Sequence, residues 1–346
     1  MKGKGQQPKT PAAAANVTPR ARLPRRSRPV LRWTVPVLLA LMLGAAWGAF
    51  LSEDFPAVVA WWALLTLVPL LGLLAFVPTA LYAAWKKSAT APVLATLLLG
   101  LFALWPGAWN WDLGKIAFPI TIEHALPAAS VRLPSDQPLR VLWGGDHLKT
   151  NQHAFFPDQR WAYDLGVEPS LVNSFRLADY GCWGTPVVAP ANARVAGMRS
   201  DKPDEAPGTL ANPTQPFGNF VSLELESKTY LVIAHLQAGS VLVHEGDLVQ
   251  EGQPIARCGN SGHTSEPHIH IHHQRQPLNP ELPNFAQGLP LFFRDHDGAA
   301  MPEGGLDVVG ERAVARGAQV RHVGKQAATA APAGDQEAAS KPAGKL

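Results

Sequence analysis

Long uncharged apolar stretches dominate the first third of the chain. Stretches of 20, 31 and 24 uncharged residues follow Arg32, Asp54 and Lys87 in turn. About 20 helical residues cross the hydrocarbon core of a bilayer, so each stretch is long enough to span it. A cleavable signal peptide is disfavoured, because its apolar region would be shorter and nothing after it should span. The pattern predicts three transmembrane helices, at about 33–52, 57–85 and 91–111.

From residue 112 onward, short apolar runs alternate with turn residues. The runs are rich in β-branched and aromatic residues and are separated by Gly, Pro, Asn and Asp, which is typical of strands. They lie at 186–189, 220–226, 230–236, 241–243, 254–257 and 268–272. The sequence therefore predicts a mainly antiparallel β domain over 112–295. We expect the Ala-rich tail, 296–346, to be disordered because it offers little to a packed core.

The uneven distribution of charge sets the expected orientation. Residues 1–32 carry nine Lys or Arg and no acid, whereas residues 112–346 have 19 basic and 25 acidic residues. Because positive charge stays on the cytoplasmic side, tail 1–32 and Lys86-Lys87 should lie inside. The protein is then a multi-pass protein of the inner (cytoplasmic) membrane, with its C-terminal domain in the periplasm or outside. The acidic outer part disfavours a nucleic-acid partner.

The chain has two cysteines, Cys182 and Cys258. Two are too few for a disulfide framework or a cysteine-based zinc module. In an oxidising compartment the two cysteines either form one disulfide or stay unpaired as small apolar residues, and the sequence leaves both alternatives open.

Histidines alternate with isoleucines near the end of the β-rich region. Side chains on a strand alternate between its faces, so His268, His270 and His272 would share one face. Neutral imidazole suits zinc, which makes this face a candidate metal site as well as a place for ordinary core or surface histidines. Upstream, the run 230–236 presents His235 at its end.

Four motifs in residues 218–272 resemble those of the lysostaphin/LytM-like zinc endopeptidases, which cleave peptide bonds in peptidoglycan. They are Ala234-His235-Leu236, the G-D-x-V-x-x-G-Q-x-I stretch at 246–255, Gly259-Asn260-Ser261-Gly262, and Pro267-His268-Ile269-His270. The pair Gly218-Asn219 also matches a Gly-Asn that opens a strand in that family. The resemblance implies a duplicated-hybrid-motif-like β-sandwich with an open groove, holding one zinc ion per chain.

The resemblance also implies roles for three histidines. His270, the second His of the P-H-x-H motif, would be a zinc ligand. His235 and His268 would flank the catalytic water as an acid/base and transition-state-stabilising pair. Zinc lowers the pKa of a bound water and polarises a carbonyl, and an unligated His can then move a proton, so this assignment fits the chemistry.

The remaining zinc ligands are less directly marked, because no His in the chain has an Asp four positions later. Residues 151–165 resemble a branch of the family in which N-x-H and Q-R-x-A-x-D replace that compact motif. On this interpretation His153 and Asp164 complete the site with His270. Asp158 is the rival ligand, although it follows Pro157 in an expected turn, whereas 162–165 is an expected strand.

We expect Arg160, Asn219 and His272 to line the substrate groove. Arg160 would pair with a substrate carboxylate or with a structural acid, and His272 would support the ligand face or form groove wall. The Pro- and Asp-rich loop 197–216 would be either a lid over the groove or a disordered insertion.

The function predicted is that of a membrane-anchored zinc endopeptidase. Its partners would be peptidoglycan cross-links or another extracytoplasmic peptide, the lipid bilayer and a membrane partner bound by the three helices. The alternative is a non-catalytic module of the same fold that recruits or regulates a cell-wall hydrolase. The presence of all five expected site residues favours activity. A lipoyl or biotinyl carrier is disfavoured, because the only nearby lysine, Lys228, lies before the motifs.

Overall fold

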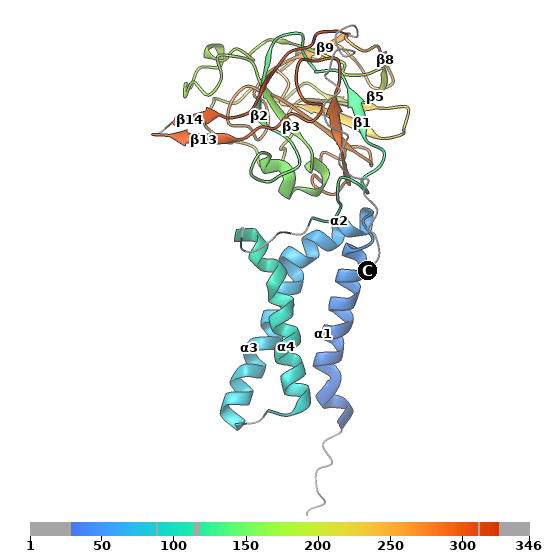
Figure 1. The fold of residues 1–346 in the computed structure, drawn as a ribbon, viewed down its shortest axis with the longest axis vertical. Helices are drawn as coiled ribbons and strands as arrows, with labels where there is room; N and C mark the ends of the chain where they lie inside the picture. Colours follow the sequence, from blue (N-terminus) through green and yellow to red (C-terminus); the bar gives the residue numbers. More distant parts are fainter. Residues whose placement is uncertain are drawn as a thin grey trace, which may run out of the picture.

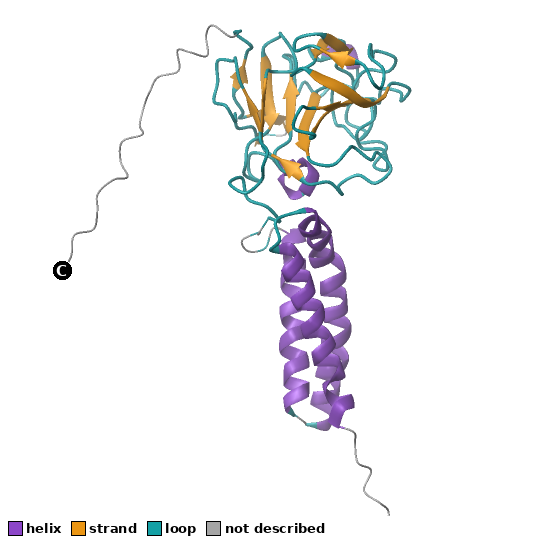
Figure 2. Cartoon of the chain, turned by 90° about the vertical axis from the view of Figure 1, so that its right-hand side faces the viewer, coloured by secondary structure: helices purple, strands orange, loops and turns teal. Residues whose placement is uncertain are grey.

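A helical bundle and a β-rich domain make up the protein (Figures 1 and 2). The computed structural model describes residues 29–87, 89–111, 113, 116, 118–310 and 312–324. Most of the basic tail 1–32 and the final part of the Ala-rich tail therefore lie outside the described residues.

Three helices of the bundle are long and apolar enough to cross a membrane: Arg32–Phe50, Phe55–Lys86 and Ala91–Trp111. They coincide within a few residues with the three predicted spans. The elements are α1 (Pro29–Phe50), α2 (Phe55–Trp62), a π-helical turn (Ala63–Leu67), α3 (Val68–Lys86), α4 (Ala91–Leu104) and a 3₁₀ turn (Trp105–Trp111). The side chain of Asp54 caps the start of α2 by accepting a hydrogen bond from the amide of Phe55 (2.8 Å).

The bundle packs through small residues at one level and aromatic residues at another. A Cβ atom added to Gly72 of α3 would lie 2.6 Å from Cβ of Ala103 on α4, so this crossing needs glycine. At the end nearest the β domain, the Trp61 and Trp109 rings stack with centroids 5.7 Å apart. Both tryptophans are buried, as is Leu64 beside them.

A nine-stranded antiparallel sheet forms the centre of the β domain, in the order β15-β2-β3-β10-β7-β6-β5-β8, with β11 also paired to β10. Its strands are β2 (Leu139–Trp143), β3 (Tyr163–Gly166), β5 (Ala193–Arg199), β6 (Phe220–Glu224), β7 (Tyr230–Ala234), β8 (Leu248–Val249), β10 (Ile269–Gln274), β11 (Gly288–Leu289) and β15 (Gln319–Val320).

Three two-stranded sheets surround the central one. They pair β1 (Ala129–Val131) with β12 (Leu291–Phe293), β4 (Pro186–Val188) with β9 (Pro254–Arg257), and β13 (Leu306–Val309) with β14 (Arg312–Ala315). The β13–β14 hairpin projects from the side of the domain in Figure 1. Alternate residues of the central strands, such as Val141, Leu165, Ile233 and Ile271, point into one fully buried core.

Two sequence predictions differ from this architecture. The expected strand at 241–243 is an irregular segment, although Val243 is still buried in the core. The tail expected to be disordered from 296 is ordered through 324, where it forms β13, β14 and β15. The physical reason is a long-range pairing: Val320 aligns with Leu139 of β2 and is fully buried. Composition alone does not reveal a partner so far away in the sequence.

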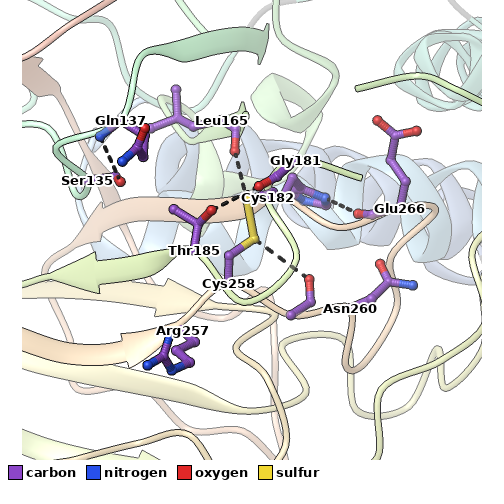
Figure 3. The surroundings of a disulfide bond; sticks show 12 residues. Ser135, Gln137, Leu165, Gly181, Cys182, Thr185, Arg257, Cys258, Asn260 and Glu266 are labelled. Atoms are coloured by element: carbon purple, nitrogen blue, oxygen red, sulfur yellow. Dashed lines mark hydrogen bonds between the residues drawn. A yellow bond between two sulfur atoms is a disulfide. The ribbon is translucent and has the colours of Figure 1, made fainter. Parts of the chain in front are cut away.

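The two cysteines form a disulfide that joins the segment before β4 to the segment after β9, the two strands that pair with each other (Figure 3). Cys182 precedes β4 and Cys258 follows β9, and both are fully buried. Cys258 also bridges Leu236, the residue after His235. The disulfide closes a sequence separation of 76 residues.

Removal of the disulfide should destabilise the β domain. Closing a loop of this length stabilises a fold by about 4.5 kcal/mol through the unfolded chain. The paired variant Cys182→Ala/Cys258→Ala should therefore melt about 9–18 °C below the wild type. Near-ultraviolet circular dichroism of the full chain in detergent would measure this. An unchanged melting temperature would contradict the prediction.

Candidate metal centre

Neighbouring strands bring the candidate ligands together. His270 of β10 is paired with Asp164 of β3 on one side and with Ala234 of β7 on the other. His235 follows β7 directly, so it emerges beside His270. His268 stands two residues before His270, on the same face of the strand. The sheet register therefore positions four of the five expected residues.

His153, Asp164 and His270 form a compact cluster. Nε2 of His153 lies 2.8 Å from Oδ2 of Asp164, and Nδ1 of His270 lies 2.9 Å from Oδ1 of the same carboxylate. Within the described chain, each of the three offers a ligand atom within 4.8 Å of the others. Tetrahedral zinc at its usual bond lengths spaces donors roughly 3.3 Å apart, so each imidazole nitrogen need only move by a few tenths of an ångström from the carboxylate oxygen that it contacts.

His235 and His268 stand next to this cluster. Their ring centroids are 4.8 Å apart, and Nε2 of His268 lies 3.3 Å from Oδ1 of Asp164. Each ring is held by a backbone carbonyl: Nδ1–H of His235 donates to Ser261 (2.9 Å), and Nδ1–H of His268 donates to Glu266 (2.7 Å). Because Nδ1 carries the proton in both rings, Nε2 is the atom that remains for chemistry.

Burial and neighbouring charges shift the pKa values of these groups. Burial, together with His268 and His270, lowers the pKa of His235 well below its usual range, so this ring is neutral. Burial opposes protonation of His268, but the charge and hydrogen bond of Asp164 raise its pKa. Burial also opposes ionisation of Asp164, yet His153 and His268 lower its pKa well below the usual range.

A line of hydrogen bonds along β10 supports His270. Its Nε2 lies 3.0 Å from Nδ1 of His272, and Nε2 of His272 lies 2.9 Å from Oε1 of Gln274. The amide of Gln274 then donates to the carbonyl of Gln276. Burial lowers the pKa of His270 to about 4. With neutral rings, the amide oxygen at the end fixes every proton position and leaves Nδ1 of His270 free to bind a metal.

A groove of about 360 Å³ opens over the cluster. His153, Asp164, His235 and His268 line it together with apolar and aromatic side chains: Leu142, Trp143, Phe156, Leu171, Leu210 and Leu306. Leu210 brings the loop 197–216 to the groove wall, and the same loop is attached to the core by the bridge between Asp204 and Ser261. Polar residues (Gln152, His263, Thr264, Ser265 and Glu266) complete the lining, so the groove combines a polar floor with walls of mixed character.

None of the three expected groove residues lines the groove; Arg160 pairs with a structural acid and His272 supports the ligand face, as the alternatives given for them predicted. Arg160 is buried against Asp146 and the Phe118 ring. The side-chain amide of Asn219 donates to the carbonyls of Lys202 and Leu236. His272 is fully buried next to His270, as described above. Each lies within the domain, where internal groups hold it.

Asp158, the rival ligand, is also separate from the cluster. It is the middle residue of a 3₁₀ turn (Pro157–Gln159), and its Oδ2 accepts a hydrogen bond from the amide of Asn284 (3.2 Å). Burial raises its pKa to about 6.

Sequence reasoning missed Gln274, Glu266 and Phe156. The alternation of β10 extends to Gln274 and could have indicated its place on the ligand face. Glu266 holds His268 through its backbone carbonyl, and its carboxylate also favours the charged form of that histidine, but it lies outside the alternating pattern of β10. Phe156 follows the His153 turn and faces the groove, but nothing in the pattern distinguishes it from Phe155 beside it.

Comparison with known proteins identifies part of this domain. The model of peptidase family M23 matches residues 178–280, which include His235, His268 and His270 but not His153 or Asp164. No curated protein sequence matches the chain significantly.

Several solved structures are similar to the chain. The catalytic domain of the antimicrobial peptidase lysostaphin from Staphylococcus simulans is 24% identical, and the alignment covers 30% of this chain and 67% of that one (TM-score 0.22). A zinc-containing peptidase from Vibrio cholerae is 20% identical over 44% of this chain and 40% of that one (TM-score 0.26). The deep-sea M23 metalloprotease pseudoalterin is 15% identical over 56% and 99% (TM-score 0.31). The chain thus spans less than half of the V. cholerae structure.

The family match over residues 178–280 contains all four motifs noted in the sequence. Residues 178–280 of the chain are therefore identified as a region of peptidase family M23.

Proposed function

We propose that the protein is a membrane-anchored zinc metalloendopeptidase that hydrolyses peptide cross-links of peptidoglycan outside the cytoplasm. M23 peptidases are zinc metallopeptidases that act on peptidoglycan. The observation that carries the proposal is the cluster of His153, Asp164 and His270, which lies beneath a groove that His153 and Asp164 line together with His235 and His268. The three apolar helices and the basic tail 1–32 support the membrane anchor and the expected orientation.

The donor set fits zinc, since two neutral imidazoles and one carboxylate leave a fourth position open for water or substrate. His153, Asp164 and His270 would hold the ion through Nε2, a carboxylate oxygen and Nδ1. When bound, zinc would polarise the scissile carbonyl and make water a stronger nucleophile. The burial of Asp164 and His270 keeps bulk water away from the ligands.

The two unligated histidines suit different tasks. His235 is neutral, and its Nε2 has a free lone pair, so it would take the proton from the attacking water. His268 has a raised pKa, so its Nε2 would carry a proton and stabilise the negative charge that develops on the carbonyl oxygen. Backbone carbonyls hold both rings, so neither group has to reorient during the reaction.

A non-catalytic module that recruits or regulates a wall hydrolase is the second candidate. It needs neither zinc nor Nε2 atoms free in the groove. The complete set of five site residues favours the enzyme, and metal content separates the two candidates.

Zinc content provides the first test. The purified full chain in detergent should contain about one zinc ion, and His270→Ala should lose it because a ligand is removed from a three-residue set. His244→Ala, which changes an exposed histidine outside the site, is the matched control and should keep the metal. Mass spectrometry measures zinc per chain. A folded wild type that never takes up zinc would favour the non-catalytic module.

Peptidoglycan digestion provides the second test. His235→Ala and His268→Ala should each keep zinc but lower the hydrolysis rate about 10²- to 10⁴-fold, the usual contribution of a positioned acid or base. Chromatography of the released peptides measures the rate, and metal content is followed in parallel. Rates within threefold of wild type in either variant would rule out the role assigned to that histidine.

A further inference from the structure

The three metal ligands are fixed in different ways. Asp164 and His270 belong to paired strands, so the sheet sets their separation. His153 lies outside the sheet, in a one-turn 3₁₀ helix (Gln152–Phe155). Asn151 caps this turn by accepting a hydrogen bond from the amide of His153 (3.0 Å), and its own amide donates to the carbonyl of Gly145 (2.9 Å). These bonds shape the turn, but they leave its outer side without a strand partner.

The outer side of the turn packs on the helical bundle. The Phe155 ring meets Trp61 of α2 edge to face, with centroids 5.4 Å apart, and the Phe156 ring lies 6.4 Å from that of Trp62. Trp61 is fully buried, stacked between Trp109 of the bundle (5.7 Å) and Phe118 (6.0 Å). The residues that follow His153 therefore rest on a part of α2 that is itself firmly packed.

Hydrogen bonds reinforce the same contact. Nε1 of Trp62 donates to the carbonyl of Asn284 (2.9 Å). The amide of Asn284 donates to Asp158, and its side-chain oxygen accepts a hydrogen bond from Gln159 (3.2 Å). Trp62 is thus connected through one residue to the 3₁₀ turn that follows Phe156. The segment from His153 to Gln159 is therefore attached to the bundle at both of its 3₁₀ turns.

We infer that the helical bundle is a structural part of the metal centre: Trp61 and Trp62, through Phe155 and Phe156, position His153 for metal binding. The inference rests on the proposed function, which supplies the zinc. Trp61 and Trp62 act as positioning residues, because neither touches the ligand atoms. Loss of an outer contact that orients a metal ligand typically weakens metal binding about 10- to 100-fold.

The test is the zinc affinity of the full chain in detergent, measured by competition with a chelator of known affinity. Trp61→Ala, Trp62→Ala and Phe155→Ala should each bind zinc about 10-fold or more weakly than the wild type. Trp61→Phe keeps an aromatic ring on Phe155 and should recover most of the affinity. Trp85→Ala is the matched control, since this tryptophan is exposed elsewhere on the bundle and should leave zinc affinity unchanged.

A double-mutant cycle separates positioning from general loosening of the fold. If Trp61 acts through Phe155, Trp61→Ala/Phe155→Ala should bind zinc no more weakly than either single variant. Thermal melts identify any variant that does not fold; if Trp61→Ala is one, Trp62→Ala, which leaves the buried Trp61 in place, decides the outcome.

Three results would overturn the inference. The first is a zinc affinity equal to that of the wild type in every folded variant. The second is a loss of zinc affinity in Trp85→Ala as large as that in the Trp61 and Trp62 variants. In both cases the wild type still binds zinc, so the proposed function stands. The third is a wild type that binds no zinc, which overturns the proposed function as well.

Discussion

The pairing of β3 with β10 is the constraint on which the site depends. It places Asp164 directly opposite His270 in adjacent antiparallel strands, where side chains on the same face lie closest. A shift of one residue in this register would turn His270 into the core and Ile269 or Ile271 toward the groove. The apolar residues on the other face of β10 make that shift unfavourable. The hydrophobic core therefore keeps the polar face in its register.

The polar face of β10 shows how one strand can bury several histidines close together. His268, His270 and His272 stand on one face, and each has a hydrogen-bond partner on at least one ring nitrogen. Desolvation keeps His270 neutral, whereas the Asp164 carboxylate favours the charged form of His268. Asp164 raises the pKa of both rings, so it is the different balance between desolvation and charge that gives chemically identical side chains different protonation states. A buried polar network of this kind stabilises the fold only when its members are satisfied together.

Sequence predicted the site better than it predicted the domain that holds it. The His–Ile alternation and the motifs around His235, His268 and His270 are local patterns, so they could be read directly. The three long apolar helices could also be predicted, because the length of each stretch and its lack of charged residues identify them. The disulfide remained an alternative, and the strands of 306–320 were missed, since both depend on segments distant in the chain. Arg160 and Asn219 were expected in the groove because polarity alone does not tell an internal partner from a substrate.

The contact between α2 and the β domain has a spatial consequence. Phe156 lines the groove and also contacts Trp62, and Gln287 donates a hydrogen bond to the carbonyl of Glu53 at the loop before α2. A domain on a flexible linker would search a volume that grows with linker length. Here the groove is docked on the helices instead. With the helices in a bilayer and the activity as proposed, the groove would lie at one fixed height above the lipid, and only bonds that pass through that thin layer would come within its reach.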